Sequence, residues 1–241
     1  MPPTPANTGP PPIRFLTWNV HKCMGTDGRR DPIRILGIIS GFAPDVAVLQ
    51  EADRKFGRKR GLLDPEEVLG LTGMRLWQPL SSTRGEAGWH GNALLVRDGI
   101  ECLSAKLLRL PSLEPRGAAV WSLRADGVGF DVVGMHLGLL GAFRRVQIVS
   151  IAAEIASRPR VPTIVAGDSN DWRWGSPAML PLEAVLGSRS ERPLTFPAGR
   201  PMLSLDRVLA GRGATLGPLA IPGAGRASDH RPVLTEVRIA A

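Results

Sequence analysis

Residues 161–170 read Val-Pro-Thr-Ile-Val-Ala-Gly-Asp-Ser-Asn, a short apolar run that ends at polar side chains. The run over 164–166 is typical of a strand covered on both faces of a sheet, and Gly167 permits a turn or a close backbone approach. Asp168 and Asn170 are two residues apart, so they share a face wherever the backbone is extended. The stretch therefore predicts either a buried strand that presents a carboxylate and a carboxamide to a site, or an Asx-rich turn.

Polar residues also stand at the ends of other predicted strands. The apolar runs that predict these strands cover residues 13–20, 45–49, 74–80, 91–96, 100–110, 118–123, 130–135, 203–209 and 233–237. Asp206 lies inside one run, where a buried charge needs a partner, and His230 is the natural candidate. We expect the polar strand ends to converge on one cleft; they are Asn19, Glu51, Asn92, His136, Asp168, Asn170, Asp206, Asp229 and His230.

Helices are fewer than strands, and the strands tend to come in hairpins. The segments that predict helices are residues 32–39, 66–71, 142–156 and 179–186. Asp31 is a candidate N-cap for the first of them, and Pro32 suits its first turn. Turns at Asp98-Gly99 and at 125–127 predict two hairpins, one joining 91–96 to 100–110 and the other joining 118–123 to 130–135. This pattern excludes a simple doubly wound parallel sheet and favours two mixed sheets packed face to face with helices outside.

The composition is that of a globular protein with a basic excess. A chain of 241 residues, 43% of them hydrophobic, can bury a sizeable core. We expect a disordered proline-rich tail over residues 1–12 and one domain over 13–241. No segment predicts a signal peptide or a membrane span, and two cysteines are too few for a disulfide framework, so we expect a soluble, cytoplasmic protein.

A net charge of +8 and a pI near 10.8 favour anionic partners such as nucleic acid, phospholipid headgroups or phosphorylated small molecules. Basic residues are densest over 54–60, which is either a solvated loop or a surface that follows a polyanion. Trp172 and Trp174 follow the key strand. They predict either stacking on a base or a lipid headgroup, or cover for the edge of the core.

Taken in order, the motifs resemble those of the endonuclease/exonuclease/phosphatase superfamily. They are Thr17-Trp18-Asn19-Val20-His21, Leu49-Gln50-Glu51, Gly91-Asn92-Ala93-Leu94-Leu95, His136-Leu137, Gly167-Asp168-Ser169-Asn170, Ser204-Leu205-Asp206-Arg207-Val208 and Ser228-Asp229-His230-Arg231-Pro232-Val233. The resemblance implies a four-layered α/β/β/α sandwich and a divalent-metal-dependent phosphoesterase. The superfamily includes deoxyribonucleases, apurinic-site endonucleases, inositol polyphosphate phosphatases and sphingomyelinases, so the fold does not choose the substrate.

The resemblance also implies a metal site. Glu51 would be the main ligand, with Asn19 beside it and Asp229 available to the same or a second ion. All three side chains offer hard oxygen atoms, which suit Mg²⁺ or Mn²⁺ better than Zn²⁺.

Roles in catalysis follow from the same resemblance. Asp168 would orient and deprotonate the attacking water, and Asn170 would hold that water or a phosphoryl oxygen. His230, supported by Asp206, would stabilise charge on the phosphorus. The remaining expectations are His136 as a phosphate contact or leaving-group acid, and Arg116 and Asn92 as substrate-binding residues.

Two departures from the family pattern narrow the function. Ser169 replaces a residue that is commonly aromatic in the family. Apurinic-site endonucleases use a tyrosine at their active site, and this chain contains no tyrosine, which argues against that function. We expect a phosphodiesterase acting on nucleic acid or on a phospholipid-like diester. The alternatives are a phosphomonoesterase of a small molecule such as an inositol phosphate, and a binding protein without catalysis. The oligomeric state stays open.

Overall fold

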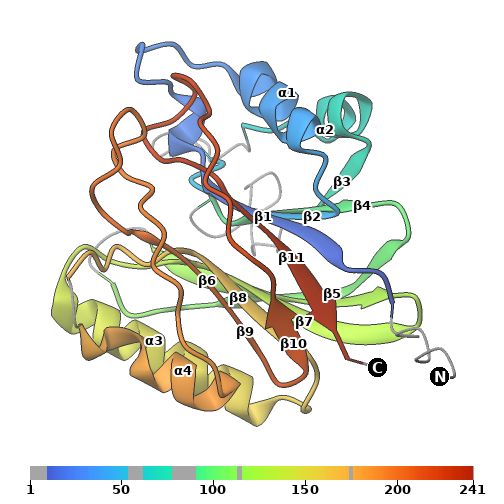
Figure 1. Ribbon diagram of the computed structural model, residues 1–241, viewed down its shortest axis with the longest axis vertical. Helices are drawn as coiled ribbons and strands as arrows, with labels where there is room; N and C mark the ends of the chain where they lie inside the picture. The colour runs from blue at the N-terminus through green and yellow to red at the C-terminus, as the bar shows by residue number, and fades with distance from the viewer. Residues whose placement is uncertain (1–9, 54–61, 78–90, 113–115, 174–175, 241) are drawn as a thin grey trace, which may run out of the picture.

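The computed structural model describes residues 10–53, 62–77, 91–112, 116–173 and 176–240. Two mixed β-sheets pack face to face, and helices cover the outer face of each (Figure 1). The predicted α/β/β/α sandwich is therefore confirmed. Most of the proline-rich head, the basic residues of 54–60 and Trp174 lie outside the described residues.

The first sheet has six strands in the order β10-β11-β1-β2-β4-β3, and the second has five in the order β5-β6-β7-β8-β9. The strands of the first sheet are β1 (Ile13–Asn19), β2 (Val46–Gln50), β3 (Met74–Trp77), β4 (Ala93–Arg97), β10 (Ala214–Leu216) and β11 (Val233–Ile239). Those of the second are β5 (Ile100–Leu108), β6 (Gly117–Ala125), β7 (Val128–His136), β8 (Thr163–Asp168) and β9 (Asp206–Gly211). Only β1 with β2 and β7 with β8 pair in parallel within the described residues.

Apolar residues fill both faces of each sheet because each sheet lies between two layers. In β1, Phe15 points into the core between the sheets, whereas Leu16 and Trp18 point to the helix side. In β8, Ile164 and Val165 divide between the two faces in the same way. Side chains alternate between the two faces of a strand, and because both faces are buried, the strand has a nearly continuous apolar run in the sequence.

The helices are α1 (Pro32–Phe42), α2 (Pro65–Thr72), α3 (Gly141–Ser157) and α4 (Leu180–Leu186). The first two cover the six-stranded sheet and the last two cover the five-stranded sheet (Figure 1). Helix α1 begins as the sequence predicts, because the side chain of Asp31 accepts a hydrogen bond from the backbone N–H of Arg34 at 2.9 Å. No helix in the described residues is both long and apolar enough to span a bilayer.

One predicted hairpin is confirmed and the other is wrong. Strands β6 and β7 pair across Asp126-Gly127, both of which have positive φ, as a two-residue hairpin turn requires. Strands β4 and β5 do not pair: β4 lies between β2 and β3 in one sheet, and β5 pairs with β6 in the other. The turn at Asp98-Gly99 reverses the chain and also carries it across the sandwich, which a local turn signal does not specify.

Strand pairing brings the polar strand ends to one end of the sandwich. In the first sheet Asn19 pairs with Gln50, the residue before Glu51. In the second sheet Asp168 pairs with His136 on one side and with Asp206 on the other. Asp206 is the first residue of β9, not a residue in the middle of a strand as predicted.

Candidate active site

A cavity of about 380 Å³ lies at this end of the sandwich. Seven of the ten predicted site residues line it: Asn19, Glu51, Arg116, Asp168, Asn170, Asp229 and His230. The other three, Asn92, His136 and Asp206, are buried behind its wall. The structure thus brings together residues that are up to about two hundred positions apart in the chain.

The carboxylate of Asp168 lies close to three other polar side chains of the site. Its Oδ2 accepts a hydrogen bond from Asn19 Nδ2 at 3.0 Å, and it lies 3.4 Å from His136 Nε2 and 3.9 Å from His230 Nε2. Burial favours the neutral acid, but the hydrogen bond from His136 and the charges of both histidines outweigh it and hold the pKa of Asp168 well below its usual range. Asp168 is therefore ionised at neutral pH.

The backbone around Asp168 explains the glycine before it and the asparagine after it. A Cβ on Gly167 would lie 2.0 Å from the carbonyl oxygen of Met135 in the neighbouring strand, so only glycine fits there. Strand β8 ends at Asp168, and Asn170 adopts a left-handed conformation with a φ of 50°. The side chain of Asn170 donates a hydrogen bond to the carbonyl of Leu137 at 2.9 Å. This turn, and not an extended strand, brings the side chains of Asp168 and Asn170 together at the cavity.

His230 faces Asp168 from the segment before β11 and is held from behind by Asp206. Its Nδ1 lies 2.9 Å from Asp206 Oδ2, and the hydroxyl of Thr195 donates to the same oxygen at 2.5 Å. Burial lowers the pKa of His230, but Asp206, with smaller contributions from Asp168 and Asp229, raises it to about 10. His230 is therefore an imidazolium whose Nε2 points toward the cavity.

Glu51 is an anion surrounded by cations. Lys22 contacts its Oε2, and Oε1 lies 3.6 Å from Arg116 and 3.8 Å from His136. Burial raises the pKa of Glu51, but the charges of His136, Lys22 and Arg116 together lower it to about 2. Glu51 also has a φ of 56°, a left-handed conformation that is strained for a residue with a side chain.

The donor atoms near Glu51 fit a hard divalent cation. Glu51 and Asp229 contribute carboxylates and Asn19 contributes an amide oxygen, and all three side chains line the same cavity. In the part of the chain that the structure describes, no group of three or more His, Cys, Asp or Glu side chains is arranged for a metal. An ion here would be held by the amide oxygen together with the two carboxylates, a combination that suits Mg²⁺ or Mn²⁺.

The three predicted residues behind the wall do not line the cavity. His136, with 1% of its surface exposed, contacts Arg116 and lies between the carboxylates of Glu51 and Asp168. Asn92 donates a hydrogen bond to the carbonyl of Gly117 at 3.2 Å and so links the two sheets.

Sequence reasoning missed several residues of the site. His21, Lys22 and Cys23 have φ values of 46°, 57° and 55°, and this left-handed turn places His21 on the cavity and Lys22 against Glu51. The Trp-Asn-Val-His motif held a signal for His21, since a polar residue follows the strand end. Thr195 and Phe196 carry no such signal, because an irregular loop brings Thr195 to Asp206 and Phe196 to the ring of His230.

The sequence and the fold match those of a known family. The sequence profile described as the endonuclease/exonuclease/phosphatase family matches residues 16–230. The chain belongs to this family. Its members act on phosphoester bonds, and the predicted resemblance is confirmed.

The chain is also similar to individual proteins. The uncharacterised protein YbhP of Escherichia coli K12 is 33% identical over 162 residues, which cover 63% of this chain and 64% of YbhP. The chain thus matches slightly less than two thirds of that relative. A family member from Beutenbergia cavernae has a TM-score of 0.70 at 21% identity, over 95% of this chain and 72% of that one. The human nocturnin catalytic domain with bound sulfate has a TM-score of 0.70 at 20% identity, over 95% of both chains. At such identities the two structures show a shared fold.

Proposed function

We propose that the protein is a divalent-metal-dependent phosphodiesterase. One observation carries the proposal: a buried carboxylate and a buried imidazolium, Asp168 and His230, lie 3.9 Å apart at their nearest atoms on one cavity, and the oxygen donors of Glu51, Asn19 and Asp229 line the same cavity. A phosphoester bound between them would meet a proton acceptor, a positive charge and a set of hard oxygen ligands.

The attacking water would be held on the Asp168 side. Asp168 is ionised, and its carboxylate would accept a hydrogen bond from the water and take its proton as the new phosphorus–oxygen bond forms. The bond from phosphorus to the leaving oxygen would break at the same time, and that oxygen would depart with the electron pair and take a proton from water. Asn170 lies on the same wall and would orient the water or a phosphoryl oxygen.

Negative charge on the phosphoryl group would be stabilised by His230. A charge-assisted hydrogen bond from a preorganised imidazolium is strongest in a site that excludes water. Asp206 fixes the ring through Nδ1, which leaves the proton on Nε2 to face the substrate. Thr195 in turn fixes the carboxylate of Asp206.

Glu51, Asn19 and Asp229 would hold Mg²⁺ or Mn²⁺, and members of the family generally depend on a divalent metal. When bound, such an ion supplies Lewis-acid polarisation of a phosphoryl oxygen. Glu51 offers the ion a carboxylate that stays unprotonated above about pH 2.

The remaining predicted residues would support the reaction. Arg116 lines the cavity and would clamp a phosphoryl oxygen. His136 is nearly fully buried, so we assign it to positioning Glu51 and Asp168 rather than to contact with the leaving group. Asn92 would act by holding the two sheets together at the site.

Hydrolysis of bis(p-nitrophenyl) phosphate and of p-nitrophenyl phosphate, each with Mg²⁺, Mn²⁺ or EDTA, tests this proposal. We expect metal-dependent release of nitrophenol, faster from the diester, and its loss in Asp168→Asn. Asp126→Asn makes the same chemical change at an exposed turn and serves as the control. Full activity in EDTA would overturn the metal assignment, and faster hydrolysis of the monoester would reassign the protein as a phosphomonoesterase. No metal-dependent turnover of either ester, or of DNA and phospholipid, would favour a binding protein.

A further inference from the structure

Exposed hydrophobic side chains gather around the cavity. Of the thirteen large hydrophobic side chains that are exposed in the described residues, five lie in loops at the end of the sandwich that holds the cavity. We call these five the apolar rim; they are Leu139, Leu140, Trp172, Leu194 and Met202, with exposed fractions between 51% and 62%. Scattered exposed leucines are ordinary, but a group beside a functional cavity calls for an explanation.

Strand register places the loops of the apolar rim next to one another. His136, Asp168 and Asp206 pair side by side at the ends of β7, β8 and β9. The loops that hold the rim residues leave from, or lead into, these same strand ends. Leu139 and Trp172 both line the cavity, so two of these loops meet at its mouth.

Contacts between the loops support the same arrangement. The backbone N–H of Ser169 donates to the carbonyl of Leu205 at 2.8 Å. Arg192 donates to the carbonyl of Arg173 at 2.8 Å, which ties the loop before β9 to the residue that follows Trp172. The rim therefore belongs to one end of the molecule, not to separate faces.

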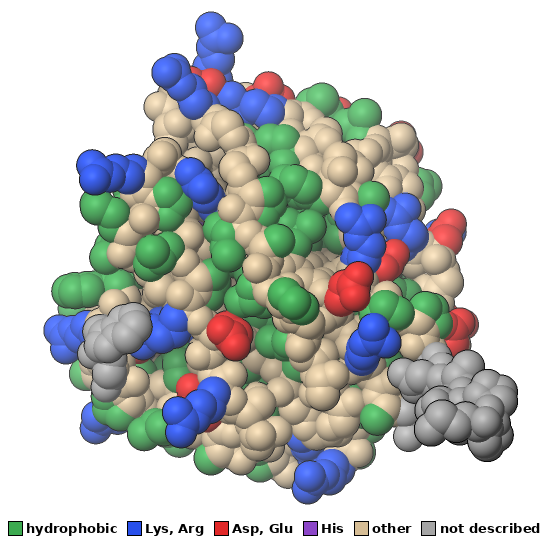
Figure 2. All heavy atoms as spheres, in the orientation of Figure 1, with side chains coloured by type: hydrophobic (Ala, Val, Ile, Leu, Met, Phe, Trp, Pro, Cys, Tyr) green, Lys and Arg blue, Asp and Glu red, His purple; other side chains and the backbone are tan. Residues whose placement is uncertain are grey.

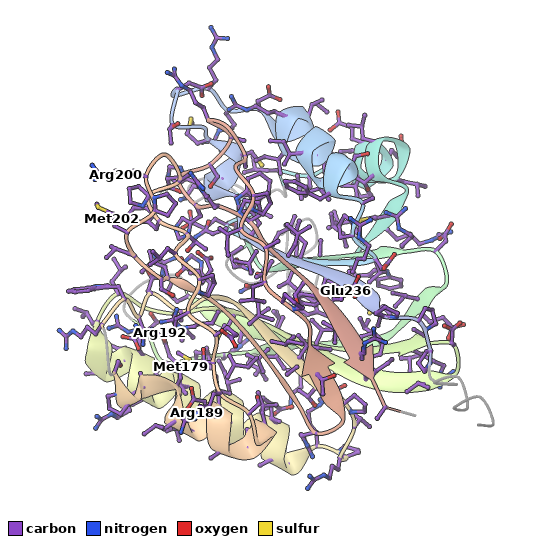
Figure 3. All side chains as sticks on the ribbon, in the orientation of Figure 1. Met179, Arg189, Arg192, Arg200, Met202 and Glu236 are labelled. Atoms are coloured by element: carbon purple, nitrogen blue, oxygen red, sulfur yellow. The ribbon has the colours of Figure 1, made fainter. Side chains whose placement is uncertain are left out.

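Exposed arginines accompany the rim. Arg145, Arg173 and Arg200 are exposed in or next to the rim loops, and Glu191 is the exposed acidic residue in the described parts of these loops. Figure 2 shows hydrophobic and basic side chains interspersed along the left edge of the molecule. In Figure 3 the side chains of Arg200 and Met202 project away from the body at this edge. The apolar rim is therefore accompanied by exposed residues whose net charge is positive.

We infer that the apolar rim docks the protein on a membrane surface that bears anionic headgroups. Leucine and methionine side chains gain free energy when they enter the boundary between headgroups and acyl chains, and neighbouring arginines are attracted to anionic lipid. A tryptophan at the same level has an amphipathic ring suited to that boundary. A polynucleotide backbone would engage the arginines but would leave Leu140 and Met202 without a partner.

Docking in this way would turn the mouth of the cavity toward the headgroup layer. Leu139 and Trp172 form part of that mouth, so lipid contact with the rim and access to the cavity would occur on the same face. Vesicle binding can be measured without hydrolysis, so its failure is distinct from failure of the proposed phosphodiesterase activity.

Flotation with lipid vesicles tests the inference. The full chain is mixed with phosphatidylcholine vesicles, with and without about one third phosphatidylglycerol, at low and high salt. We expect binding to the anionic vesicles that weakens with salt. Leu140→Ser combined with Met202→Ser removes two rim side chains that do not line the cavity, and should weaken binding about tenfold or more. Leu69→Ser combined with Leu71→Ser, at 45% and 42% exposure on α2, is the matched control and should bind like the unchanged chain.

Circular dichroism and thermal melting establish that both double variants fold before they are compared. Failure of the unchanged chain to bind anionic vesicles would overturn the inference, as would equal binding by the rim variant and the α2 control. A third result would also overturn it: salt-sensitive binding to plasmid DNA that the rim substitutions reduce, with no vesicle binding, would assign this face to nucleic acid.

Discussion

Two charged clusters lie at the cavity, and the signs of their charges are arranged in opposite ways. In the first, the anion Glu51 is surrounded by the cations Lys22 and Arg116. In the second, the cation His230 is held by the anions Asp206 and Asp168. Burial opposes ionisation in both, and the partners outweigh it in both, with the pKa lowered to about 2 for Glu51 and raised to about 10 for His230. Both groups therefore stay charged across the physiological pH range.

The clusters differ in how firmly the partner is fixed. Glu51 lines the cavity, and the side chains of Lys22 and Glu51 are 24% and 15% exposed, so we propose that Glu51 can exchange Lys22 for a cation that enters the cavity. Those of His230 and Asp206 are 6% and 0% exposed, and Thr195 adds a further hydrogen bond. An exchangeable anion suits a metal ligand, whereas a locked imidazolium suits a preorganised charge that meets the substrate.

The largest effect is expected at Asp168, which lies between the clusters. Asp168→Asn removes the proposed proton acceptor and the negative charge next to both histidines, so kcat for a phosphodiester should fall by about 10³-fold. Steady-state kinetics at saturating Mg²⁺ would measure the loss, and Asp126→Asn should leave kcat unchanged. A loss of less than about threefold would remove Asp168 from the proposed chemistry.

The fixed nature of the His230 cluster predicts strong coupling. His230→Ala and Asp206→Asn should each lower kcat by roughly 10²-fold or more, because both abolish the same oriented imidazolium. The double variant should be little slower than His230→Ala alone. Losses that multiply would mean that Asp206 acts independently of His230.

The exchangeable nature of the Glu51 cluster predicts a different outcome. Glu51→Gln keeps the shape of the side chain but removes the anionic ligand, so the Mg²⁺ concentration for half-maximal activity should rise by about tenfold or more. Titration of activity with Mg²⁺ and with Mn²⁺ would measure the shift. Glu154→Gln, far from the cavity beside Lys106, is the matched control. An unchanged metal requirement would place the ion elsewhere.

The smallest effect concerns stability and pH. The pKa of His230 is raised from 6.5 to about 10 on folding, so its contribution to stability is fully present below pH 6.5 and is lost as the pH rises through about 10. Thr195→Val removes a hydrogen bond to Asp206 and should alter this pH dependence modestly, whereas Thr195→Ser should preserve it. Thermal unfolding from pH 6 to 10 in EDTA, where metal binding does not contribute, would measure both, and identical profiles for the two variants would argue against a positioning role for Thr195.

Local chemistry accounts for what the sequence predicted correctly. The apolar run over 164–166, the cap at Asp31 and the hairpin at Asp126-Gly127 each depend on a few neighbouring residues, and each forms as expected. The pairing of β4 with β5 was wrong, because the turn at Asp98-Gly99 contains no information about which sheet receives the next strand.

The sequence by itself determined the strand ends and the side chains that they carry, because a polar residue after a buried apolar run marks the point where a strand leaves the core. Only the tertiary structure decided which of these residues reach the cavity and which stand behind it. His136 and Asp206 are buried on the two strands that flank Asp168, one on each side of it. Thr195 and Lys22 join the site through an irregular loop and a left-handed turn. Their positions depend on packing between segments far apart in the chain, which no local pattern encodes.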